Sequence, residues 1–212
     1  MGGLGFMADI PITDIYPCLE ELLEGKYEIQ ERVMIQGNIN SGESCFAVND
    51  IVIHRAQNPS LVDLSVHIDG VYLNTFSADG LIISTATGST AYSLAAGGPI
   101  IHPQLEALVL TPISPHTISN RPFVFSPKQK IQIQYLNETK PVEITYDGIS
   151  QCSLKTGEMF HVTNSTRKFK IISLERHNYF TTLRQKLNWS GQIRNRNIYI
   201  SLSSRKKYSI TT

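Results

Sequence analysis

The sequence predicts a mainly β protein, an antiparallel β-sandwich with few helices. Two observations lead to this prediction. About ten short apolar runs follow one another with turn residues between them, and only three short segments have helical character. A chain of 212 residues, with 41% hydrophobic and 17% charged residues, is also long enough to bury a sizeable core.

The first helix is expected soon after the N-terminus. Thr13 or Asp14 can cap it, and Pro17 is tolerated in its first turn. Gly25 favours its end, and its apolar face would be formed by Leu19, Leu22 and Leu23. Three glycines among the first five residues suit a tight turn. We therefore expect residues 1–27 to form a linker and a helix.

From residue 28 the apolar pattern changes to a period of two, which is typical of strands with one buried face. Asp69-Gly70 lies between two such runs and predicts a hairpin. Residues 28–175 are therefore expected to form the sandwich. The expected strands are 33–39, 45–53 with a break at 49–50, 61–68, 71–73, 81–83, 122–125, 131–135, 142–146, 160–163 and 169–174.

Two more helices are expected. One runs from about Thr90 to Ala96, where glycines and a proline end it, and the other covers about Tyr179 to Leu187 within a C-terminal segment 176–191. Residues 192–212 contain basic side chains and no acidic one. They are expected to form a mobile tail, the alternative being a basic arm for an anionic partner.

Charge and cysteine content narrow the function classes. A formal net charge of +1 gives no reason to expect a nucleic-acid or membrane-surface partner. Three widely spaced cysteines form no CxxC pair and predict free thiols in a reducing compartment. No apolar stretch reaches the length of a membrane span, and the first residues do not resemble a signal peptide. The expected location is the cytoplasm.

The most unusual segment is 77–93, which contains the run Ser-Thr-Ala-Thr-Gly-Ser-Thr-Ala-Tyr-Ser. It predicts a strand, a hydroxyl-rich turn and a helix start, where free N–H groups suit a pyrophosphate or a ribose. A capped helix after a tight turn would have the same composition. No lysine follows the glycine, so the segment is not a Walker P-loop.

Three further polar positions are candidate site residues. Asn49-Asp50 divides a buried run, either as a ligand site or as a turn or β-bulge. Asp79 and Asp147 each precede glycine, a pairing that most often marks a turn. The six histidines have no metal-ligand spacing, and no GxSxG signature is present.

Taken together, these segments resemble the NAD kinase family. The resemblance covers about residues 1–191 and rests on several segments in order. They are the glycine-rich start, Asn49-Asp50, Asp79-Gly80 through Tyr92, Gly97 to Ile100, Pro112 to His116 with Arg121-Pro122, and Leu183 to Trp189.

The resemblance implies a two-domain enzyme that works as a homo-oligomer, with this β-sandwich as its C-terminal, NAD-binding domain. It implies that Asn49 and Asp50 hold the NAD ribose, that Asp79 contacts the nicotinamide side, and that Tyr92 offers an aromatic face to a base. The full set of implied substrate-binding residues is Asn49, Asp50, Asp79, Gly80, Thr87, Gly88, Ser89, Thr90, Ala91, Tyr92, Ser93 and Asp147.

Three departures from the family pattern stand out. The Gly-Gly-Asp-Gly motif, which carries the family's catalytic aspartate, does not occur, so the usual N-terminal α/β domain is expected to be missing. No catalytic residue and no metal ligand is therefore assigned to this chain, although Asp79 would be the first candidate for a base if the chain were active alone. Ser77 stands where many members have Arg, and Ile149 where Gln is common.

The implied reaction transfers a phosphoryl group from ATP or polyphosphate, with Mg²⁺, to the adenosine 2′-hydroxyl of NAD, giving NADP. The alternative is a catalytically incompetent protein that binds a dinucleotide or assembles with a full-length partner.

Overall fold

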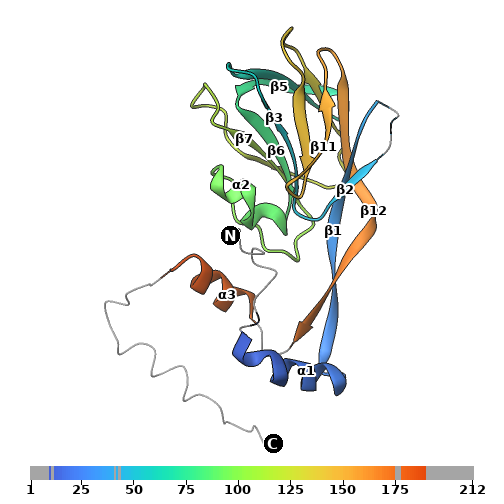
Figure 1. Cartoon of the computed structure of the whole chain (residues 1–212), viewed down its shortest axis with the longest axis vertical. Coiled ribbons are helices and arrows are strands. Elements are labelled where there is room, and N and C mark those ends of the chain that lie inside the picture. Colours follow the sequence, from blue (N-terminus) through green and yellow to red (C-terminus); the bar gives the residue numbers. More distant parts are fainter. Residues whose placement is uncertain (1–9, 11, 41, 43, 175–177, 190–212) are drawn as a thin grey trace, which may run out of the picture. The chain divides into compact units, whose positions relative to one another are not determined.

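The computed structural model describes residues 10, 12–40, 42, 44–174 and 178–189, and it confirms a mainly β, antiparallel fold (Figure 1). The expected linker residues 1–9 and the tail 192–212 lie outside the described residues. The chain divides into two compact units, one ending at residue 175 and the other beginning at residue 176.

Two six-stranded antiparallel sheets form the first unit. The first sheet has the order β2 (Cys45–Ala47), β1 (Tyr27–Ile39), β12 (Met159–Leu174), β9 (Ile131–Tyr135), β4 (Val62–Ile68) and β5 (Val71–Ala78). The second has the order β11 (Ile149–Leu154), β10 (Val142–Tyr146), β3 (Asp50–His54), β6 (Gly80–Thr85), β7 (Leu108–Ile113) and β8 (Phe123–Phe125).

The core lies between the two sheets and contains buried side chains from both. Alternation along a strand places every second side chain on the same face. In β3, Ile51 and Ile53 belong to this core and are fully buried, so Asp50, Val52 and His54 face the other side of the second sheet. This outer face is where the candidate site lies.

The chain crosses from the first sheet to the second at two points that matter for the site. Val48 and Asn49 connect β2 to β3, and Asp79 connects β5 to β6. Because β3 and β6 pair antiparallel, with Asp50 opposite Ser84 and His54 opposite Gly80, the two crossings lie at opposite ends of this strand pair. The polar break at 49–50 is thus a change of sheet.

Helices are short. A 3₁₀ turn (η2, Ile12–Asp14) precedes α1 (Ile15–Leu23). After the end of α1, Gly25 has a left-handed backbone conformation with φ +74°. A second 3₁₀ turn (η3, Gly88–Thr90) precedes α2 (Tyr92–Ala95). In the second unit, Asn178 caps α3 (Tyr179–Lys186) by accepting N–H groups of Phe180 and Thr181.

Some local expectations were wrong. The side chain of Asp14 makes no capping hydrogen bond, and the helix expected from Thr90 to Ala96 is a 3₁₀ turn followed by one short helix. The two strands expected within 160–174 are one strand, β12, which stays paired with β1 through an irregularity between Val33 and Ile35. Strands β7 and β11 were not predicted.

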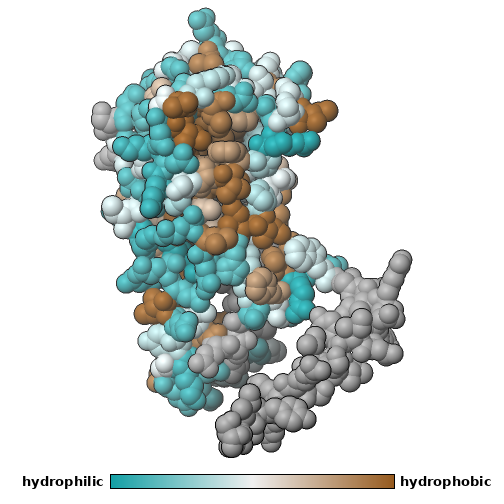
Figure 2. Space-filling model, turned by 180° about the vertical axis from the view of Figure 1, so that it is seen from behind, coloured by the Kyte–Doolittle hydropathy of each residue, from teal (hydrophilic) through white to brown (hydrophobic). Residues whose placement is uncertain are grey.

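Several large apolar side chains remain exposed, and Figure 2 shows a band of apolar residues along one face. The exposed set includes Tyr27 and Ile29 of β1, Ile172 of β12, and Phe123 and Val124 of β8. Contiguous apolar surface of this kind is typical of interaction sites. In the part of the chain that the structure describes, no helix has the length and hydropathy needed to cross a lipid bilayer.

Candidate functional site

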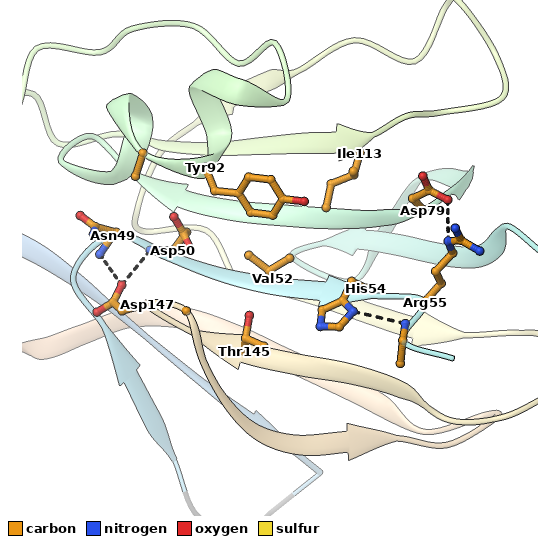
Figure 3. A pocket seen from close by; sticks show the side chains of 13 residues that line it. Asn49, Asp50, Val52, His54, Arg55, Asp79, Tyr92, Ile113, Thr145 and Asp147 are labelled. Carbon is orange, nitrogen blue, oxygen red and sulfur yellow. Dashed lines mark hydrogen bonds and ion pairs between the residues drawn. The ribbon is translucent and has the colours of Figure 1, made fainter. Parts of the chain in front are cut away.

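A cavity of about 660 Å³ lies over the outer face of the second sheet (Figure 3). Its floor follows β3, where Asp50, Val52 and His54 alternate toward it, with Thr145 of the neighbouring β10 beside them. The remaining lining residues are Asn49, Arg55, Ala56, Asp79, Ala91, Tyr92, Ile113, Asp147 and Gly148. Its volume is typical of a small-molecule site.

The structure brings half of the predicted site residues to this cavity, namely Asn49, Asp50, Asp79, Ala91, Tyr92 and Asp147. They come from both sheet crossings, from the start of α2 and from the turn between β10 and β11. Asp50 and Asp79 therefore face the same side of the sheet, although they lie at opposite ends of the strand pair. Whether these side chains bind substrate stays a prediction.

The other half does not line the cavity: Gly80, Thr87, Gly88, Ser89, Thr90 and Ser93. Ser89 donates its hydroxyl to the carbonyl of Ala86 at 2.7 Å, and Ser93 shares a hydrogen bond with Thr111 at 2.9 Å. A Cβ at Gly88 would overlap the carbonyl oxygen of Asn49, so only glycine fits there. These positions shape the wall behind the cavity.

The start of α2 offers fewer free donors than the sequence suggested. The N–H groups of Gly88, Ser89 and Ala91 donate within the turn, to Thr85 Oγ1 and to two backbone carbonyls. The N–H of Tyr92 donates to the carboxylate of Asp50. A helix of one turn also has little macrodipole, so an anion cradle at this helix is not what the geometry favours.

Asp50 is the most perturbed acid of the cavity. Its exposed fraction is 5%, and burial raises its pKa to about 6, helped by the negative charge of Asp147 and opposed by the N–H of Tyr92. An acid with a pKa this close to neutrality can accept or hold a proton during a reaction. This property was not visible in the sequence.

Asp147 lines the cavity, and its carboxylate also binds the backbone of the crossing between β2 and β3. Its Oδ2 accepts the N–H of Val48 at 2.8 Å, and its Oδ1 accepts those of Asn49 at 2.7 Å and Asp50 at 3.1 Å. Both oxygens are thus engaged by backbone. The carboxylate holds the crossing between β2 and β3 in place, which positions the side chains of Asn49 and Asp50.

At the other end of the cavity, Arg55 holds Asp79. Its Nε lies 2.8 Å from Oδ1 of Asp79, and its Nη1 donates to the carbonyls of Asn58 at 2.8 Å and Pro59 at 3.1 Å (Figure 3). Sequence analysis did not identify Arg55. A basic residue directly after the strand that begins with the predicted Asp50 was the signal that could have revealed it.

His54 was also not predicted. Its Nδ1 accepts the N–H of Ala56 at 3.2 Å, and its Nε2 lies 3.4 Å from Oε2 of Glu143. Tyr92 is 47% exposed, and in Figure 3 its ring lies above Val52, between Asp50 and Ile113. The ring of Tyr92 and the side chains of Val52 and Ile113 form a slot that suits a flat, apolar-faced group.

Residues 48–174 match the sequence profile of the ATP-NAD kinase C-terminal domain. The chain belongs to the NAD kinase family. It is 59% identical over 194 residues to an NAD kinase of Protochlamydia amoebophila, covering 92% of this chain and 70% of that protein. It is 44% identical to an NAD kinase of Geotalea daltonii, over 89% of this chain and 68% of that protein.

A solved structure agrees with this assignment. Yeast NADH kinase, in complex with NADH, superposes with a TM-score of 0.81 at 29% identity, covering 92% of this chain and 58% of the yeast chain. The NAD kinase resemblance of the sequence is confirmed, and so is the antiparallel fold of the family's C-terminal domain. The chain spans about two thirds of the length of these relatives.

Proposed function

We propose that this chain binds NAD as the acceptor-side domain of an NAD kinase, in which a phosphoryl group of ATP or polyphosphate is transferred to the adenosine 2′-hydroxyl. The observation that carries this proposal is the convergence of Asn49, Asp50, Tyr92 and Asp79 on one cavity from three separate segments. Family membership and the likeness to an NADH-bound kinase support it.

In this proposal the cavity has two ends. At one end, the amide of Asn49 and the carboxylate of Asp50 form hydrogen bonds with a ribose. Ala91 and the ring of Tyr92 contact a base. Asp79, held by Arg55, faces the nicotinamide side. Burial of polar side chains next to an apolar slot is the arrangement that orients such a ligand.

The remaining residues of the predicted set support this site from behind. Gly80, Thr87, Gly88, Ser89, Thr90 and Ser93 fix the path of the chain, and Asp147 fixes the crossing at 48–50. Their proposed contribution is positioning, and their substitution would weaken binding by displacing Asn49, Asp50 or Tyr92.

Mg²⁺ would enter this reaction with ATP. Among residues 10, 12–40, 42, 44–174 and 178–189, no three His, Cys, Asp or Glu side chains are grouped closely enough to hold a metal ion.

We further propose that the 212-residue chain by itself forms no measurable NADP. A positioned general base typically contributes about 10²–10⁴-fold to such a transfer, and the Gly-Gly-Asp-Gly motif that carries it in the family is not in this sequence. Among the acids of the cavity, Asp50 is a better substitute base than Asp79, whose carboxylate is ion-paired with Arg55.

The test has two parts. Calorimetric titration of the purified chain with NAD should give saturable binding that Asn49→Ala weakens at least tenfold. Asn38→Ala should leave it unchanged, because the amide of Asn38 donates to the carbonyl of Asn40 and Asn38 does not line the cavity. No heat of binding in any variant would reject the acceptor-site proposal.

The second part is an assay of NADP formation with ATP or polyphosphate and Mg²⁺, on this chain and on one extended with a family N-terminal domain. If the extended chain turns over and the 212-residue chain does not, the result supports the proposal that the N-terminal domain supplies the catalytic base. Equal turnover by both would place the base within these 212 residues. No turnover by either would favour the catalytically incompetent, dinucleotide-binding alternative.

The homo-oligomer and the cytoplasmic location stay predictions. The exposed apolar side chains of β1, β12 and β8 support self-association. Light scattering coupled to size-exclusion chromatography measures the oligomeric state directly. A monomer at all concentrations would contradict the predicted homo-oligomer.

A further inference from the structure

Two cysteines far apart in sequence lie on edge strands of the two sheets, and neither lines the cavity. Cys45 lies on β2, the edge strand of the first sheet, and Cys152 lies on β11, the edge strand of the second sheet. Both thiols are free and partly exposed, and both pack against the same core cluster.

The strand registers bring the two thiols to one buried tyrosine. Cys45 pairs with Gly37 across β2 and β1, and the hydroxyl of Tyr146 donates to the carbonyl of Gly37 at 3.4 Å. Cys152 pairs with Ile144, which lies two residues from Tyr146 on β10. The hydroxyl of Tyr146 thus lies beside Gly37, the register partner of Cys45, while Cys152 lies on the strand next to that of Tyr146, and both thiols interact with this tyrosine.

We propose that Cys45 and Cys152 form a reversible disulfide that joins the edge strands of the two sheets. The oxidant is a small-molecule disulfide such as oxidised glutathione. The Cys45 thiolate attacks it and releases one small thiol. The Cys152 sulfur then attacks the mixed disulfide at Cys45 and releases the second. Two protein thiols are oxidised, one small disulfide is reduced to two thiols, and the two protons go to the released thiolates.

The surroundings assign the order of these steps. Burial raises the pKa of Cys152, which makes this thiol the poorer first nucleophile and the resolving one. The two cysteines also flank the crossing described above, because Cys45 precedes Val48 and Cys152 follows Asp147. The disulfide would therefore restrain the two segments that the Asp147 carboxylate already connects.

The experiment uses the full chain equilibrated with reduced and oxidised glutathione at graded ratios, then alkylated and mapped by mass spectrometry. We expect a loss of about 2 Da from the intact protein, a linked peptide pair containing Cys45 and Cys152, and reversal by dithiothreitol. Cys18 is buried and serves as the internal reference, because it should become alkylated only after the chain is denatured.

Variants make the assignment specific. Cys18→Ser should retain the linked pair, whereas Cys45→Ser and Cys152→Ser should each abolish it. Oxidation should also raise the urea midpoint of the wild-type chain and of Cys18→Ser, but not of the other two variants.

The proposal is overturned if both thiols remain alkylatable at every glutathione ratio. It is equally overturned if each cysteine accumulates its own glutathione adduct with no linked pair. A link that forms only in denaturant, or only between two chains, would also refute it.

Discussion

Asp147 and Asp50 are joined in both directions across the turn that forms one end of the cavity. The carboxylate of Asp147 accepts the N–H of Asp50 at 3.1 Å, and the N–H of Asp147 donates to the carbonyl of Asp50 at 3.0 Å. The same carboxylate accepts two more N–H groups, from Val48 and Asn49. Asp147, which is predicted to bind substrate, thus also supports the backbone of Asn49 and Asp50.

Asp147→Ala should lower the free energy of unfolding by about 1–3 kcal/mol, because it leaves backbone N–H groups without an acceptor. It should also weaken NAD binding by releasing Asn49 and Asp50. Urea unfolding and calorimetry measure the two effects.

Asp69→Ala is the matched control for this variant. Asp69 also precedes glycine in a tight turn, and its Oδ1 accepts the N–H of Lys130 at 2.9 Å, but it does not line the cavity. Its loss should destabilise the fold without changing NAD affinity. Equal effects of both variants on affinity would contradict the supporting function of Asp147.

The raised pKa of Asp50 makes stability depend on pH. The folded protein, with a pKa of about 6, binds more protons than the unfolded chain, with an ordinary value of 3.8. Stability should therefore fall as the pH rises between these values and remain lower above pH 6, by about 3 kcal/mol for a shift of this size.

Asp50→Asn tests this directly. It should be more stable than the wild-type chain at pH 7.5 and close to it at pH 4, in urea unfolding at both values. It should also bind NAD more weakly, because the carboxylate is lost. A gain in stability at the cost of binding is a common trade-off at functional sites. Glu138→Gln, at an exposed position, should show neither effect. A stability difference that is the same at both pH values would rule out Asp50 as the source.

Arg55→Gln removes the partner of Asp79. Both side chains are more than a third exposed, at 39% and 34%, so the ion pair itself should contribute only about 0–1 kcal/mol to stability. NAD affinity should change more than stability does, because Asp79 would lose its fixed orientation. A double-mutant cycle with Asp79→Asn measures the coupling in binding, and additive effects would mean that the pair has no function in the site.

Gly88→Ala should destabilise the fold by more than about 2 kcal/mol, because its Cβ would overlap the backbone of Asn49 and force the crossing apart. Gly157→Ala is the control. Gly157 has φ +78° and open space around it, so only backbone strain of about 1 kcal/mol is expected. Thermal unfolding of the two variants compares them, and similar losses would show that contact with Asn49 is unimportant.

The strands that sequence analysis missed show what the pattern could not reveal. Strand β11 follows Asp147-Gly148, a turn signal like Asp69-Gly70, but residues 149–154 have no clear apolar alternation from which a strand could be predicted. In β7, Pro112 is unusual for an inner strand. It is tolerated because β8 pairs only with residues 108–110, so the side of Pro112 toward β8 is unpaired.

The sequence by itself determined the fold class, the family and the segments that surround the cavity. Period-two apolar runs and Asp-Gly turns are local signals, since each depends on backbone geometry within a few residues. The tertiary structure alone decided which of the polar residues face the cavity. Asp79 meets Arg55, and Asp147 meets Val48, through strand pairing between segments distant in sequence. The burial that raises the pKa of Asp50 likewise exists only when one sheet crossing, the turn at Asp147 and a short helix surround one carboxylate.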